Sequence, residues 1–309
     1  EAETLHQDVL AVSTHKLVHV QAVGFARCAS RGQGCYVAGF GHTLEFEKVL
    51  EKLSTYAAFS ASAELARNIH PSNELQAARE RQAFTTETRH LYSSEADITI
   101  GGSRDVRPLA NRAAQHGMLE PTELLSIRYT LASARDLSRT LLEQADTLPL
   151  LGQLGQELPP PPGIIEAISR VISERGEVLD NASPKLSSIR SEIKVAHDRL
   201  LSKLNQIIAD PHKSKMLQET LITQRNGRYV IPLRSEFKGR INAIIHDQSA
   251  SGATLFVEPL VTVELNNRWH ELQLAERDEI RRILLELSDM IGAEVVQIRA
   301  IVDALSRFD

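Results

Sequence analysis

The sequence predicts a mainly α-helical protein that carries one small antiparallel β insert. Apolar residues recur at steps of three and four along two long segments, at about 184–209 and 261–308, which is typical of amphipathic helices. Between these segments, strand-like alternation surrounds an Asn-Gly turn. We therefore expect a helical core and two long antiparallel helices, with the β insert at their junction.

Composition narrows the classes of function. The chain has 309 residues and a formal net charge of −5, so it is not uniformly cationic, and any contact with phosphates must be concentrated in patches. Only two cysteines occur, which excludes a disulfide scaffold and favours the cytoplasm. No apolar run approaches the ~20 residues needed to cross a bilayer, so we expect no membrane partner.

Residues 1–42 are expected to form an irregular N-terminal extension. The glycines of RGQGCYVAGFG (31–41) do not have the spacing G-x-G-x-x-G and lack a surrounding βαβ pattern, so no dinucleotide site is predicted. Cys28, Cys35 and His42 lack the second ligand pair of a zinc site, so no metal site is predicted either.

Residues 43–163 are expected to form a helical core. An apolar stripe predicts a helix over 44–56, and a second helix should end before Pro71. A third runs from a cap at Ser72 to about 92, and a short one follows the turn at 101–106. Pro121 sits where a first-turn proline belongs and opens another helix. The prolines of PPPPG at 159–163 end the core.

The first long helix belongs to a segment, 164–216, that begins with a short helix over 164–172. Ser183 is predicted as the N-cap and Pro184 as the first helical residue of the long helix, which extends over roughly 26 residues, or about 40 Å. The second long helix fills 263–309 and returns antiparallel to the first. Trp269 near its start is expected to pack, and Asn266 and Asn267 to cap this helix or hold the base of the β insert.

The β insert covers 217–262. Asn226 and Gly227 predict a hairpin between 221–223 and 228–231, and further strands are expected at 241–245 and 254–257. Pro232 and Pro259 should lie at strand ends or edges, since proline donates no ladder hydrogen bond. A sheet of three or four antiparallel strands is the prediction.

The β insert is also the most basic part of the chain. Five cations stand against a single acid, Glu236, over 225–240: Arg225, Arg228, Arg234, Lys238 and Arg240. They are the predicted nucleic-acid-binding residues, because such side chains neutralise phosphates without reading bases. Strand alternation means that about three of them would share a ligand. The alternative is a solvated strand face.

The stretch HDQSASGAT (246–254) contains the residue types of a hydrolase triad. Triad members are rarely neighbours in sequence, and a strand sends adjacent side chains to opposite faces, so no catalytic role is predicted. His246 and Asp247 are instead expected to hydrogen-bond the turn, where Gly252 supplies an unusual φ.

Four segments together resemble the MutS-two family of bacterial MutS paralogues, usually labelled endonuclease MutS-two. They are RNGRYVIPLRSEFKGRINAIIHDQSASGATLFVEP followed by VELNN, TLEFEKVLEKLSTYAAFS from 43, DVRPLANRAAQHGMLEPTELL from 105 and DNASPKLSSIRSEI from 180. The resemblance covers about 43–309. It implies a helical core (43–163), a connector and outgoing lever helix (164–216), a β-rich clamp (217–262) and a returning lever helix (263–309).

The resemblance also implies parts that this sequence does not contain. Family members continue into an ABC-type ATPase that binds ATP and Mg²⁺ and drives homodimerisation, and commonly end in a small MutS-related nuclease domain. No G-x-x-x-x-G-K-[ST] motif occurs here, so we expect no cofactor, no catalytic residue and no ATP hydrolysis from this chain alone.

The family is associated with two kinds of target. Its members bind branched DNA and suppress recombination, and they engage stalled ribosomes, so the resemblance implies branched DNA, ribosomal RNA or the ribosome as partner, with the clamp as the contact. The alternative is a structural and dimerisation scaffold that transmits motion while other domains bind.

Overall fold

The computed structural model describes residues 45–72, 74–94 and 98–309. The predicted extension and the patterns within it, at 1–42, lie outside the described residues. The described residues fall into two compact units, 45–55 with 66–71, and 56–65 with the remainder from 72 to 309. None of the described helices combines the length and the apolar composition needed to span a membrane.

The first unit contains α3 (Phe46–Ser54), where the apolar stripe predicted a helix. Leu50 is buried, and Oε2 of Glu51 accepts a hydrogen bond from Nε of Arg67 at 3.0 Å. Helix α4 (Ser60–Arg67) runs from the second unit into the first.

The second unit contains a helical core. Its helices are α5 (Leu75–Ser94), α6 (Arg107–Ala114), α7 (Pro121–Glu143), α8 (Pro149–Glu157), α9 (Ile164–Val171) and α13 (Val295–Phe308). Pro121 is the first residue of α7, as predicted, because proline presets a helical φ and a first-turn residue needs no backbone donor. Glu120 and Glu123 form a capping box there.

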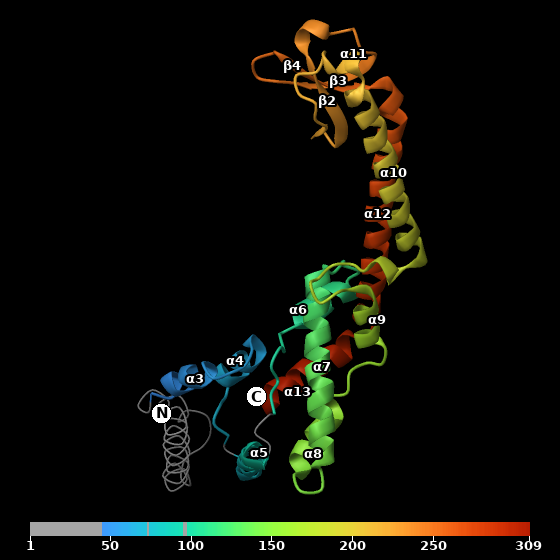
Figure 1. Ribbon diagram of the computed structural model, residues 1–309. Helices are drawn as coiled ribbons and strands as arrows, with labels where there is room; N and C mark the ends of the chain where they lie inside the picture. The colour runs from blue at the N-terminus through green and yellow to red at the C-terminus, as the bar shows by residue number, and fades with distance from the viewer. Residues whose placement is uncertain (1–44, 73, 95–97) are drawn as a thin grey trace. The chain divides into compact units, whose positions relative to one another are not determined.

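Two long helices extend from this core and lie side by side (Figure 1). Helix α10 is Pro184–Ala209, with the N-cap at Ser183, whose Oγ accepts from the backbone N–H of Leu186 at 3.0 Å. The predicted start and length are therefore confirmed. Helix α12, Leu260–Ala293, returns along α10. Short helical turns η1 (Asp180–Ala182) and α11 (Pro211–Ser214) flank α10.

The returning segment is two helices and not the single one predicted. Helix α12 ends at Ala293, Glu294 is not helical, and α13 begins at Val295. Just before this break, a Cβ at Gly292 would lie 2.6 Å from the carbonyl oxygen of Ala113, so α12 crosses α6 in close backbone contact there. From Ile283 onward, the returning segment contributes to the helical core.

The β insert forms a four-stranded antiparallel sheet in the order β1-β2-β4-β3. Its strands are β1 (Thr223–Arg225), β2 (Arg228–Arg234), β3 (Ala243–Gln248) and β4 (Thr254–Pro259). Asn226 and Gly227 have φ of 50° and 73°, the positive values of a type I′ hairpin turn, which confirms the predicted hairpin.

Two proline predictions have different outcomes. Pro259 ends β4, as predicted, but Pro232 lies inside β2. Its carbonyl oxygen accepts from the backbone N–H of Gln218 at 2.9 Å, in a short bridge that pairs Leu217 with Leu233. The bridge needs only the carbonyl of Pro232 as an acceptor. Because it needs no backbone N–H donor at this position, the strand tolerates the proline.

The sheet packs against the ends of α10 and α12 through a second hydrophobic core. The core contains Leu200, Leu204 and Ile207 of α10, Ile231 and Leu233 of β2, Leu255 and Val257 of β4, and Trp269 of α12. Trp269 is buried, with its ring centroid 5.0 Å from that of Tyr229, so the prediction that it packs is confirmed.

Candidate nucleic-acid interface

The five predicted cations divide into two groups in the structure. Arg225 and Arg228 are half-buried and have internal partners, whereas Arg234, Lys238 and Arg240 are exposed. By the alternation of strand β2, Arg228 and Arg234 lie on the same face of the sheet. The two groups have different physical roles, because only an exposed cation can exchange its water and counterions for a phosphate.

Arg228 donates to a buried carboxylate. Its Nη1 lies 3.0 and 3.2 Å from the two carboxylate oxygens of Glu258, a side chain with no exposure to solvent. Nε2 of His246 lies 2.6 Å from Oε2 of the same carboxylate, and because a carboxylate only accepts, this nitrogen carries the proton. Nδ2 of Asn266 donates to Oε1 at 2.8 Å. The sequence predicted that His246 hydrogen-bonds the turn. In the structure its ring bonds Glu258 instead, so this prediction was wrong.

The same network joins the sheet to α12. Asn266 accepts from the backbone N–H of Tyr229 at 3.0 Å and donates to its carbonyl at 3.1 Å, as a neighbouring strand would. Asn267 accepts from Nη2 of Arg228 at 2.6 Å. The prediction that these asparagines hold the base of the β insert is confirmed. When buried polar groups have all their hydrogen-bond partners, as here, they stabilise one specific arrangement of strands and helix.

Arg225 is held on the surface of the sheet. Its Nε lies 3.2 Å from Oδ2 of Asp247, and its guanidinium carbon lies 4.1 Å from the ring centroid of Phe256. Its Nη1 donates to the carbonyl of Gln224 at 2.8 Å. An arginine stacked on a ring beside a carboxylate is largely compensated within the protein.

The exposed group has few internal partners. Nε of Arg234 donates to the carbonyl of Leu217 at 3.2 Å, and its Nη1 is 3.9 Å from Glu236. Lys238 and Arg240 follow η2 (Ser235–Phe237) in the connection to β3, and neither side chain has a hydrogen bond or an ion pair with any residue in the described part of the chain. Their backbone N–H groups donate to Ser235 and Phe237, which orders the connection.

Sequence reasoning missed one further exposed cation, which precedes two residues that hydrogen-bond to Arg234. Lys215 is exposed and directly precedes Met216, whose carbonyl accepts from the backbone N–H of Arg234 at 3.0 Å. Only the high basicity of 184–216 could have drawn attention to it. We call Lys215, Arg234, Lys238 and Arg240 the cationic edge.

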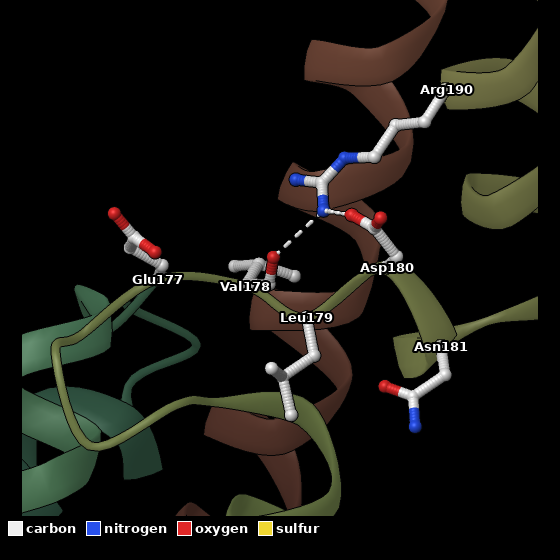
Figure 2. A pocket seen from close by; sticks show the side chains of 6 residues that line it. All are labelled: Glu177, Val178, Leu179, Asp180, Asn181 and Arg190. Carbon is white, nitrogen blue, oxygen red and sulfur yellow. Dashed lines mark hydrogen bonds and ion pairs between the residues drawn. The ribbon is translucent and has the colours of Figure 1, made fainter.

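The base of the helix pair is a second polar region, with a cavity of about 680 Å³. Figure 2 shows the side chains that line this cavity. Arg190 of α10 reaches across it to the connection before α10, where its Nη1 donates to the carbonyl of Val178 at 2.9 Å and to Asp180. Its Nε donates to Glu276 of α12 at 2.7 Å. These bonds offset the positive charge of Arg190 and connect the first half of α10 to α12.

Glu279 of α12 strengthens the same junction. Its side chain has no exposure, and it accepts from Oγ of Ser183 at 2.8 Å, Nζ of Lys185 at 3.1 Å and Nη2 of Arg282 at 2.6 Å. The hydrogen bond from Arg282, with smaller contributions from Lys185 and Ser183, lowers the pKa of Glu279 to about 2. A single carboxylate thus holds the N-cap of α10.

Comparison with known proteins decides the family. No protein-family model matches the chain. Proteins named Endonuclease MutS2 from Symbiobacterium thermophilum and Geobacillus sp. are 37% identical over 267 residues and 38% over 271, which is 86% and 87% of this chain. The chain belongs to the MutS2 family. It spans about a third of the length of these relatives, 33% and 35%.

Membership of the MutS2 family confirms the resemblance found in the sequence. A relative from Thermomicrobium roseum, with the same name, is 37% identical over 269 residues, again 86% of this chain. The name describes those proteins as endonucleases. In the described part of this MutS2 chain, no group of three or more His, Cys, Asp or Glu side chains is arranged to hold a metal ion.

Proposed function

We propose that this MutS2 chain binds the sugar–phosphate backbone of nucleic acid through the cationic edge of its β insert, the part that corresponds to the predicted clamp. The observation that carries the proposal is the contrast within the sheet: Arg225 and Arg228 are compensated, while Lys238 and Arg240 are exposed and have no side-chain partner among the described residues. Cations in that state release counterions from a polyanion on contact, which is the main source of sequence-independent affinity.

Within this proposal, Arg228 and Arg225 support the binding surface. Arg228 holds the buried carboxylate of Glu258, so its first role is to position the strands that carry Arg234 and lead into Lys238. Reversing the charge of Arg228 would place a second carboxylate beside Glu258. We therefore expect charge reversal of Arg228 to lower the stability of the chain.

Two features support branched DNA or ribosomal RNA as the substrate. Backbone contacts by lysine and arginine favour no base sequence, which suits a protein that recognises structure. The family resemblance implies these two nucleic acids as targets. The cationic edge is compatible with both, because each is a polyanion.

A titration tests the proposal. The chain is titrated into labelled junction DNA, duplex DNA and ribosomes at about 0.05 M and 0.2 M salt, beside Lys238→Glu/Arg240→Glu. The control is Arg277→Glu/Arg281→Glu on α12, two exposed arginines without an ion pair among the described residues. We expect salt-dependent binding that the first double variant loses and the control, of equal charge, keeps.

The alternative is a structural and dimerisation scaffold that transmits motion. The observation in its favour is that the Glu258 and Glu279 networks fix α10, α12 and the sheet to one another. It predicts that the folded chain binds none of the three ligands at either salt concentration. That outcome would replace the proposed function with the scaffold.

A further inference from the structure

The two long helices carry a groove between them, separate from the cationic edge. It has a volume of about 390 Å³ and is lined by Asp198, Arg199, Ser202, Lys203 and Gln206 of α10 and by Leu265 of α12. Four of these residues, at positions 199, 202, 203 and 206, follow the i, i+3, i+4, i+7 spacing of one helix face. The lining of the groove therefore follows one face of α10, and Leu265 adds a half-buried apolar side chain from α12.

The lining of this groove holds two cations and one acid, so its net charge is positive. Arg199 and Lys203 are exposed, and neither has an ion pair with any residue in the described ranges. The one acid, Asp198, has its nearest basic partner in His197, at 3.8 Å, and its side chain is 82% exposed. The neighbouring cation of α12, Arg268, is neutralised by Glu192 at 2.7 Å, so the excess charge is confined to Arg199 and Lys203.

The spacing of the two cations fits a phosphodiester strand. Four residues of α-helix advance about 6 Å, and one strand of duplex DNA carries a phosphate about every 3.4 Å of helix axis, so the pair spans about two phosphates. The hydroxyl of Ser202 and the amide of Gln206 add donors on the same face. Leu265, which lines the groove beside them, offers an apolar surface to the sugar.

We infer that this groove on α10 is a second phosphodiester-binding site, which extends the nucleic-acid path from the cationic edge along the helix pair. The inference rests on the proposed function, because it concerns the same ligand. It adds a path for the ligand: the nucleic-acid strand that the cationic edge binds continues beside α10, past Lys203 and Arg199. The helix pair is then part of the binding surface and not only a support for the sheet.

Fluorescence anisotropy with a labelled duplex DNA tests the inference. Three double variants each remove two positive charges: Arg199→Gln/Lys203→Gln in the groove, Lys238→Gln/Arg240→Gln in the cationic edge, and Arg277→Gln/Arg281→Gln as the control. Helical geometry turns Arg277 and Arg281 about 120° and 160° from Leu265 around α12, away from the groove. A charge-conserving variant, Arg199→Lys/Lys203→Arg, and circular dichroism show whether a loss of binding comes from charge or from unfolding.

The groove variant should bind about 60-fold more weakly than the unaltered chain at about 0.1 M salt. Each phosphate contact contributes about −0.9 to the slope of log K against log salt, so two contacts strengthen binding by about 1.8 log units when salt falls from about 1 M to about 0.1 M. The control and the charge-conserving variant should bind like the unaltered chain. If the groove variant also keeps full affinity while the cationic-edge variant loses it, the inference is wrong and the proposed function stands. If no variant changes the affinity, or the unaltered chain does not bind, both are wrong.

Discussion

Nη1 of Arg228 lies 3.0 and 3.2 Å from the two carboxylate oxygens of Glu258, whose side chain is closed to solvent. His246 and Asn266 donate to the same carboxylate, so one buried charge links β2, β3, β4 and α12. The most basic segment of the chain therefore uses its cations in two ways. Some fix the sheet on the helix pair, and those of the cationic edge remain available to a ligand.

Replacing Arg228 with alanine should destabilise the β insert by about 3 kcal/mol, because the change leaves the Glu258 carboxylate buried with only neutral donors and one histidine. Urea unfolding followed by the fluorescence of Trp269, which lies in the same hydrophobic core as the sheet, measures the loss. Arg240→Ala is the matched control and should change the free energy of unfolding by less than about 0.5 kcal/mol. Equal stabilities of the two variants would contradict the proposed role of the network.

The stability of the chain should fall in acid partly through Glu279. Its pKa is about 2 in the folded protein and 4.5 ordinarily, so the folded state binds fewer protons than the unfolded state between these values. The stabilisation is thus complete above about pH 4.5 and is lost as the pH falls towards 2. Glu279→Gln removes this titration, so its unfolding free energy should depend less on pH between about 5 and 3. Identical pH dependence of the two proteins would contradict the assignment.

Replacing Gly292 with alanine should separate α12 from α6. The added Cβ would lie 2.6 Å from the carbonyl oxygen of Ala113, a backbone atom that cannot move alone. We expect a loss of about 1–3 kcal/mol, in the range of an overpacked core, despite the better helix propensity of alanine. Thermal unfolding measures it. Val296→Ala, at a site 79% exposed on α13, should leave the midpoint unchanged, and a stable Gly292→Ala variant would show that the crossing is looser than described.

The features that sequence predicted well are local. Ser183 and Pro184 fix the start of α10 through a cap and a preset φ, and Asn226 with Gly227 fixes the hairpin through positive φ. Each depends on residues within a few positions, so the pattern in the chain is enough. Helix periodicity likewise gave α7 and the apolar faces of α10 and α12.

The features that sequence missed depend on distant partners. The bond between Arg228 and Glu258 joins residues 30 positions apart, and a count of cations cannot show that one of them is compensated. The close crossing of α12 and α6 brings Gly292 against Ala113, two residues far apart in the chain. Lys215 joins the cationic edge only because Met216 and Leu217 hydrogen-bond to Arg234, which no spacing rule predicts.

The salt dependence of binding tests the central claim most directly. The affinity of the chain for duplex DNA is measured from about 0.05 M to 0.3 M salt, beside Lys238→Gln/Arg240→Gln. Each phosphate contact contributes about −0.9 to the slope of log K against log salt, so the four cations of the edge predict a slope of about −3.6 or steeper. Removing Lys238 and Arg240 should make the slope shallower by about 1.8. A flat dependence, or an equal slope for the two proteins, would contradict the claim that the cationic edge binds phosphates.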